Sequence, residues 1–353
     1  MSSSTSNSKS HCSATKSRGN LPWAFLGMVV CIALIEWMIA VLSPHATTDL
    51  LSHRFYNATQ VPTLDESIVQ WQIYNLFTSD ENPDLLFLGD SSCLMGVVPR
   101  EVKAKTGLST LNLGTIGFLW TEGHAEVLEL FLKKHRAPQY LVYYITDYPI
   151  SISRRRIEEI GFLARFNRWI GTADTSMLSI LPSFRLRGEV PGFWAGLTRA
   201  QSRLAEPRGP FPSDDETRQI LTVTKGHMSE PRVGGIDVPF KYTPEFSRDA
   251  IPGLTRMLEI TKNASIRMIL VMNPLPESAR VPETEKAFEQ LQNALQEVLS
   301  PYKHVRVFSP FLRFYPVNQC SGDCHHLIES GAVQNSQEVG EWIAKTFGLS
   351  PGA

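Results

Sequence analysis

Short apolar runs alternate with amphipathic stretches from residue 84 onward, and this alternation predicts strands and helices in turn. The apolar runs predict strands at 84–90, 108–117, 139–148, 265–274 and 304–309. The amphipathic stretches predict helices at 122–135, 246–263, 285–300 and 329–347. Because buried parallel strands form nearly continuous apolar runs, the pattern predicts an α/β domain whose parallel sheet is covered by helices on both faces.

Two segments depart from this alternation. Residues 150–240 have no clear strand and contain the turn-rich stretch EPRGPFPSDDE, so we interpret them as an insertion in a domain that spans 84–350. Residues 44–83 are interpreted as a connecting segment with one helical piece, ESIVQWQIYNLF.

The N-terminal region predicts a membrane anchor. Residues 1–20 are polar and Ser-rich, which is typical of a disordered tail. Residues 21–43 form an apolar run long enough to cross a bilayer as a helix, although Glu36 opposes insertion. Lys9, Lys16 and Arg18 precede this run, so the N-terminus is predicted to be cytoplasmic and the domain extracytoplasmic, in the periplasm or at the cell surface. A cleaved signal peptide and a buried helix of a soluble core are the alternatives.

Composition narrows the classes of partner. The chain has 353 residues and a formal net charge of −1, so no overall field attracts nucleic acid. Five cysteines are too few and too scattered for a disulfide framework. Cys320 and Cys324 are close enough in sequence to form a disulfide in an oxidising compartment, and the sequence leaves that question open.

Candidate chemistry gathers where predicted strands end. Gly89–Ser92, Gly114–Gly117 and Thr146–Asp147 all follow strands, and ligands of parallel sheets bind at these carboxyl ends. A serine such as Ser91 needs a base, and the base needs an orienting acid. The stretch CSGDCHH offers an acid, Asp323, three residues before a histidine, His326, with His325 as an alternative base.

These motifs resemble those of the SGNH (GDSL-type) hydrolases. GDS follows the first strand, NxGxxG follows the second, and DxxH precedes the final helix, so the resemblance covers 84–148 and 264–347. It implies a three-layer α/β/α, flavodoxin-like sandwich and catalysis without a cofactor. It also implies that Ser91 is the nucleophile, Asp323 the acid and His326 the base, with the backbone N–H groups of Ser91 and Gly117 in the oxyanion hole.

Thr146 departs from the family pattern. The third family block supplies an asparagine whose side chain donates to the oxyanion, and the matching position here is a threonine with a shorter side chain. Thr146 is therefore kept as the third expected donor, although its hydroxyl is less able to reach. Membrane-anchored, divergent members of this kind resemble proteins that modify polysaccharides by O-acylation. The resemblance thus implies an esterase or O-acyltransferase with an acyl-ester or glycan substrate, working with envelope polysaccharide machinery at the membrane.

Simpler interpretations accompany each candidate residue. Ser91 is also a suitable helix N-cap, Cys93 a suitable packed core residue, and Gly114 an alternative to Gly117. The DCHH stretch contains metal-ligand types but has no further ligand cluster nearby in the sequence. As a whole, the chain could also be a non-catalytic SGNH-like scaffold or carbohydrate-binding protein. The distance from Ser91 to His326 separates these hypotheses, since an enzyme requires about 2.6–3.2 Å.

Overall fold

The computed structural model describes residues 21–42, 63–170, 211–232 and 234–350, without the side chains of 21–24, 36, 38–42 and 168. The predicted N-terminal tail, much of the connecting segment and the middle of the predicted insertion therefore lie outside the described residues.

The central feature is a parallel sheet with the strand order β2-β1-β3-β4-β6. Its strands are β1 (Leu85–Gly89), β2 (Thr110–Gly114), β3 (Tyr140–Ile145), β4 (Arg267–Met272) and β6 (Val305–Val307). Each predicted strand is present but shorter than predicted. The order matches that of flavodoxin-like sheets, which bind ligands where the strand order reverses. Here the reversal lies beside β1, and Gly89 pairs in register with Gly114 of β2 and Tyr144 of β3.

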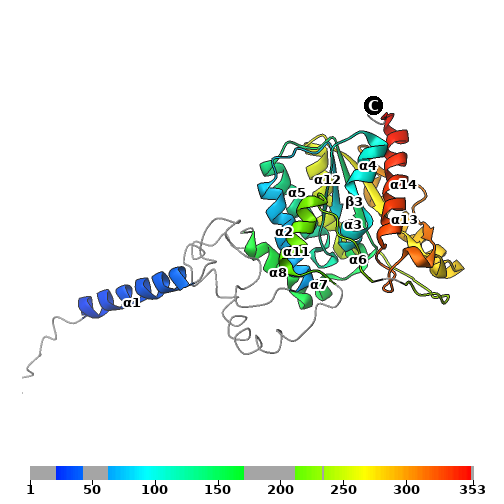
Figure 1. Ribbon diagram of the computed structural model, residues 1–353. Helices are drawn as coiled ribbons and strands as arrows, with labels where there is room; N and C mark the ends of the chain where they lie inside the picture. The colour runs from blue at the N-terminus through cyan, green and yellow to red at the C-terminus, as the bar shows by residue number, and fades with distance from the viewer. Residues whose placement is uncertain (1–20, 43–62, 171–210, 233, 351–353) are drawn as a thin grey trace, which may run out of the picture.

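Helices cover both faces of the sheet, so the predicted α/β class with a parallel sheet is confirmed (Figure 1). The four predicted helices are α5 (Trp120–Lys134), α12 (Ile251–Asn263), α13 (Pro282–Leu299) and α14 (Glu329–Phe347). On one face α5 packs against α12, and on the other α14 packs against α4 (Pro99–Thr106). A second, two-stranded parallel sheet joins β5 (Leu275–Pro276) to β7 (Phe314–Tyr315).

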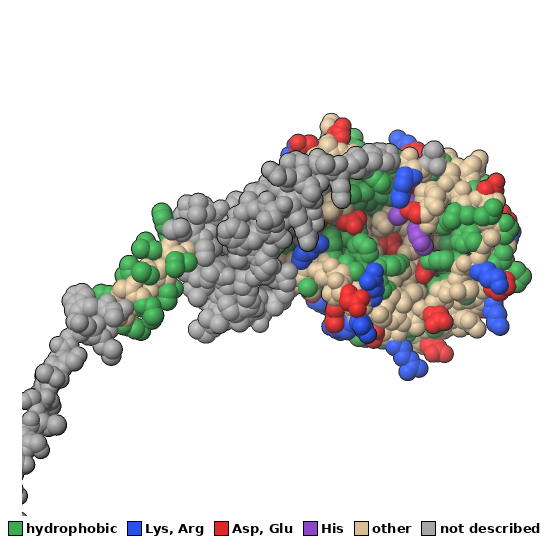
Figure 2. Space-filling view, turned by 90° about the horizontal axis from the view of Figure 1, so that it is seen from below, with side chains coloured by type: hydrophobic (Ala, Val, Ile, Leu, Met, Phe, Trp, Pro, Cys, Tyr) green, Lys and Arg blue, Asp and Glu red, His purple; other side chains and the backbone are tan. Residues whose placement is uncertain are grey.

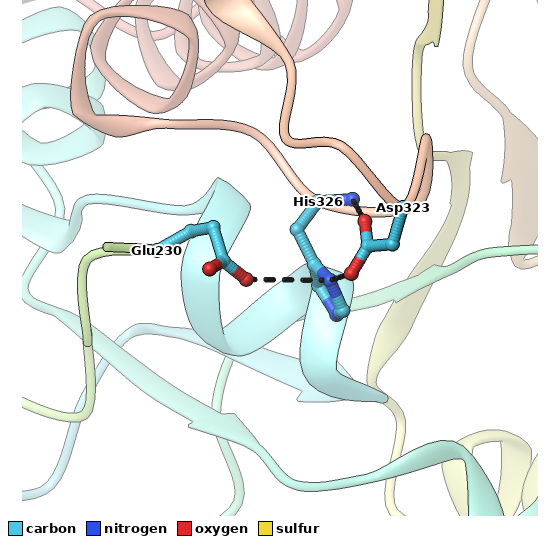
Figure 3. A group of neighbouring side chains, drawn as sticks. All are labelled: Glu230, Asp323 and His326. Atoms are coloured by element: carbon cyan, nitrogen blue, oxygen red, sulfur yellow. Dashed lines mark hydrogen bonds and ion pairs between the residues drawn. The ribbon is translucent and has the colours of Figure 1, made fainter. Parts of the chain in front are cut away.

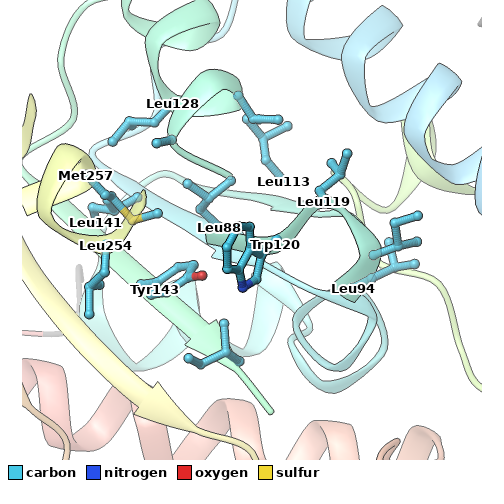
Figure 4. Packing of buried hydrophobic residues seen from close by; sticks show 14 of the residues in the cluster. Leu88, Leu94, Leu113, Leu119, Trp120, Leu128, Leu141, Tyr143, Leu254 and Met257 are labelled. Carbon is cyan, nitrogen blue, oxygen red and sulfur yellow. The ribbon is translucent and has the colours of Figure 1, made fainter. Parts of the chain in front are cut away.

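The strands are buried because their side chains fill a hydrophobic cluster on each face. One cluster includes Leu88, Leu141 and Tyr143 with residues of α5 and α12 (Figure 4). The other joins Phe87 and Val142 to residues of α4 and α14. These clusters hold the strand ends rigidly, which is what a site built on those ends requires.

Two helices outside the predicted alternation also belong to this core. α2 (Leu64–Thr78), the helical piece of the predicted connecting segment, buries Ile68, Val69 and Leu76 in the first cluster. It packs against α11 (Asp214–Val223), and both helices begin with a capping box, at Thr63 and Ser213. The remaining helices of the predicted insertion in the described part are α6 (Tyr148–Ser151), α7 (Arg154–Ile160) and α8 (Phe162–Trp169).

Helix α14 is joined to the segment that follows β1. α3 (Ser91–Gly96) begins directly after that strand, and the Asn335 side chain donates to its last carbonyl, Gly96 O, at 2.7 Å. The Ser336 hydroxyl accepts from Val98 N at 2.8 Å. The C-terminal helix therefore fixes the position of α3.

The N-terminal helix α1 (Leu21–Leu42) coincides with the predicted membrane anchor. Its described apolar side chains, such as Phe25, Leu34 and Trp37, are exposed. In the described part of the chain, no helix combines the length and apolar character that crossing a membrane requires.

Candidate functional site

The segment after β1 places Ser91 at the start of a helix. A Cβ at Gly89 would lie 1.7 Å from Tyr144 O, so glycine is needed for β1 and β3 to approach here. Asp90 caps α3 by accepting from Ser92 N at 2.9 Å. Ser91 is therefore the first helical residue, and its backbone N–H has no acceptor within the helix. The cap is Asp90, so the alternative interpretation of Ser91 as the N-cap is wrong.

A tight loop before α14 carries Asp323 and His326. Asp323 Oδ1 accepts from the backbone N–H groups of His325 at 3.0 Å and His326 at 3.2 Å, and from the Ser321 hydroxyl. This local turn brings the ring of His326 back to the carboxylate, where Nδ1 lies 2.7 Å from Asp323 Oδ2. Burial alone would raise the pKa of Asp323, but the hydrogen bond and charge of His326 hold it well below its usual range.

Ser91 and His326 meet although they are far apart in sequence. Ser91 Oγ lies 2.8 Å from His326 Nε2, which is within the distance that nucleophilic catalysis requires. The structure thus brings the three predicted residues into one chain of hydrogen bonds, from Asp323 through His326 to Ser91. In this chain the imidazole can take the serine proton while the carboxylate stabilises the resulting imidazolium.

A second carboxylate faces the same histidine (Figure 3). Glu230 Oε2 lies 3.5 Å from His326 Nδ1, and its side chain is fully buried. Arg232 binds Glu230 through two nitrogens, at 2.8 and 2.7 Å, and also reaches Asp323 Oδ2 at 2.6 Å. Glu230, Asp323 and His326 are metal-ligand types with donor atoms within 4.8 Å of one another. Arg232 already supplies positive charge to both carboxylates, so a metal ion would have to compete with it.

The candidate oxyanion donors differ in their surroundings and hydrogen-bond partners. Gly114 N–H donates to Asn112 Oδ1 at 2.7 Å, so it is not available to an oxyanion. Gly117, the preferred candidate, lies at the start of a 3-10 turn, and a Cβ there would meet the ring of Tyr148. The Thr146 hydroxyl donates to Asp90 Oδ2 at 2.8 Å, so in this arrangement its proton is already used.

The alternative residues have other partners. The ring of His325, the alternative base, makes a T-shaped contact with the ring of Tyr242, and its carbonyl accepts from Asn273. Cys93 is buried, which raises the pKa of its thiol well above the usual value and fits a packed core residue. Cys320 and Cys324 are both free thiols in the structure.

Two further carboxylates lie close to the site. Burial raises the pKa of Asp65, at the start of α2, although His326 acts on it in the opposite direction. Burial also raises the pKa of Asp147, which accepts from the Tyr242 hydroxyl at 2.6 Å. Figure 2 shows histidine side chains inside a hollow of the surface, with acidic side chains beside them. Solvent reaches this region, since the His326 side chain is 13% exposed.

Sequence reasoning missed Glu230 and Arg232. Both lie in the predicted insertion, on the segment after α11, and reach the site through contacts between distant segments. The single local signal is an acid and an arginine two residues apart, which is common on protein surfaces.

Comparisons with known proteins identify no family for this chain. No family model matches it, and no curated protein matches it. One similar solved structure is that of a protein from Streptococcus pneumonia described as a candidate platelet activating factor. It is 15% identical, and the alignment covers 79% of this chain and 92% of that chain, with a TM-score of 0.40. A similarity at this level carries no argument about function, so the functional conclusion depends on the geometry of the site.

Proposed function

We propose that the protein is a serine esterase or O-acyltransferase that acts on acyl esters through an acyl-serine intermediate. The observation that carries the proposal is the continuous contact from Asp323 to His326 at 2.7 Å and from His326 to Ser91 at 2.8 Å. The serine hydroxyl thus contacts a base, and the base contacts an acid, as an activated serine requires.

The proposed reaction uses this chain of hydrogen bonds. Ser91 Oγ attacks the ester carbonyl as its proton passes to His326 Nε2, and the new oxyanion accepts from the N–H groups of Ser91 and Gly117. The carbon–oxygen bond to the leaving alcohol then breaks, and the alcohol takes the proton from Nε2. In the second half, His326 removes a proton from water or from a sugar hydroxyl, which attacks the acyl-serine. Hydrolysis and transfer differ only in this second nucleophile.

Activated-serine labelling tests the proposal. A fluorophosphonate probe should label the purified full chain, and Ser91→Ala and His326→Ala should both abolish labelling. Ser92→Ala is the matched control, since the Ser92 hydroxyl donates to Asp90 and not to His326. Absence of labelling in a folded wild-type protein would refute the proposal and favour the non-catalytic scaffold or carbohydrate-binding function.

Membrane attachment is a second part of the proposal. The exposed apolar side chains on α1, including Phe25 and Trp37, support a bilayer as its partner. An anchor with the N-terminus in the cytoplasm would place the domain outside the cytoplasm, where acyl esters of envelope polysaccharide are the proposed substrate. Membrane fractionation of the full chain and of a variant lacking residues 1–43 tests this, and equal release of both into the soluble fraction would refute it.

A further inference from the structure

Glu230 is a fully buried carboxylate whose charge is paired with the guanidinium of Arg232. Its side chain is 0% exposed, and a buried charge is costly unless it is paired and hydrogen-bonded. Arg232 provides the pairing, with Nε at 2.8 Å from one oxygen and a terminal nitrogen at 2.7 Å from the other. The Arg232 backbone N–H adds a third bond, at 2.9 Å. Such two-pronged, charge-assisted contacts fix the carboxylate in one orientation.

The same guanidinium binds the acid of the predicted triad. An Arg232 terminal nitrogen lies 2.6 Å from Asp323 Oδ2, so one cation stands between two carboxylates. Two neighbouring carboxylates repel each other, and a cation between them offsets that repulsion. Arg232 therefore stabilises the close approach of Glu230 and Asp323.

Both carboxylates face the same atom of the histidine. His326 Nδ1 lies 2.7 Å from Asp323 Oδ2 and 3.5 Å from Glu230 Oε2. We propose that Glu230 is a second orienting carboxylate for His326, and that Arg232 makes this pairing of acids stable. Glu230 and Arg232 are positioning residues in this proposal, which rests on the proposed acyl-transfer function.

Two consequences follow for the histidine. Its ring contacts Asp323 on its own loop, Glu230 on the segment after α11 and Ser91 on α3. Arg232 binds the two carboxylates, and Asp65 on α2 interacts with the ring electrostatically. The negative charge of Glu230 adds to that of Asp323 and stabilises the imidazolium that forms when Ser91 loses its proton. Glu230 is also close enough to accept from Nδ1–H after a small ring movement if Asp323 is removed.

A double-mutant cycle tests the second role. Loss of the acid in a Ser-His-Asp triad costs about 10⁴-fold in rate, whereas Asp323→Ala should cost only about 10- to 100-fold here because Glu230 replaces it. The Asp323→Ala/Glu230→Gln double variant should then approach the full loss of about 10⁴-fold. The measurement is the second-order rate constant of fluorophosphonate labelling of the full chain. A loss of about 10⁴-fold in Asp323→Ala alone, or additive effects in the double variant, would overturn the proposal.

An NMR measurement separates this proposal from the proposed function. The Nδ1–H proton of His326, assigned with His326→Gln, reports the hydrogen bond of the ring without any reaction. In Asp323→Ala this proton should stay hydrogen-bonded and exchange slowly with water, because Glu230 accepts from it, and Asp323→Ala/Glu230→Gln should exchange it faster. Asp323→Ala/Glu338→Gln is the control, because Glu338 pairs with Arg313 and Tyr315.

The two readouts give distinct outcomes. Equal proton exchange in Asp323→Ala and Asp323→Ala/Glu230→Gln overturns the role of Glu230 even if the wild type labels. Faster exchange in the double variant, in a protein that never labels, supports the positioning role and refutes the acyl-transfer function. If Glu230→Gln fails to fold, Asp323→Ala still decides the matter, because the proposal requires its labelling rate to stay within about 100-fold of the wild type.

Discussion

Replacing Thr146 with valine separates a structural role from a catalytic one. The Thr146 hydroxyl donates to Asp90 Oδ2 at 2.8 Å and accepts from Tyr148 N at 3.2 Å, so both of its hydrogen bonds stabilise the fold. A hydrogen bond to a charged group contributes about 1.5–3 kcal/mol. Asp90 keeps its bonds from the backbone N–H groups of Ser92 and Thr146 in the variant. We therefore expect Thr146→Val to lower the free energy of unfolding by about 1.5–3 kcal/mol.

The expected effect on reactivity is small by comparison. Loss of an oxyanion donor costs about 2.7–4 kcal/mol, or 10²–10³-fold in rate. Because the Thr146 hydroxyl donates to Asp90 instead, we expect Thr146→Val to slow labelling by less than about tenfold. Urea unfolding and the labelling rate constant, measured on the same preparations, give the two numbers. Thr146→Ser keeps the hydroxyl and should match the wild type in both. A 100-fold slower rate with unchanged stability would refute this reasoning and restore Thr146 to the oxyanion hole.

Three other predictions concern stability. His124 is buried, which lowers the pKa of its ring to about 4, so the folded protein keeps it neutral while the unfolded chain takes up a proton below about pH 6.5. Stability present at neutral pH should fall by up to about 3 kcal/mol between pH 6.5 and 4, and urea unfolding of His124→Phe should lack this part of the slope. Gly89→Ala should cost about 1–3 kcal/mol or more, because the new Cβ meets Tyr144 O; an unchanged Tm would contradict the close approach of β1 and β3. Thr63→Ala should cost about 0.5–2 kcal/mol in urea unfolding through loss of the α2 cap, and no loss would mean that the cap contributes nothing.

The features that sequence predicted well are local. The strands could be found because buried parallel strands are apolar on both faces, as in β4, where each residue after Arg267 is buried. Asp323 and His326 could be paired because they are three residues apart and one tight turn joins them. Their meeting with Ser91 was an implication of the resemblance to the SGNH hydrolases, since no spacing rule relates positions 91 and 326.

The features that sequence missed depend on distant contacts. Arg232 binds Asp323 across 91 positions, and no spacing rule relates them. The Thr146 hydroxyl is directed by Asp90, 56 positions earlier, so its type alone did not reveal its partner. A turn-rich segment without strands was interpreted as an insertion, yet its last residues contribute charged groups to the centre of the site.

The attachment of α14 to α3 has a consequence for the order of biosynthesis. Asn335 binds the last residue of α3, Gly96, and Ser336 binds Val98 just beyond it, and His326 precedes both in the same C-terminal stretch. During translation, Ser91 therefore emerges more than two hundred residues before His326 and before α14. The contact between Ser91 and His326 forms only after the C-terminal stretch has folded back onto the sheet. Under the proposed function, the reactivity of Ser91 would therefore appear only at the end of folding.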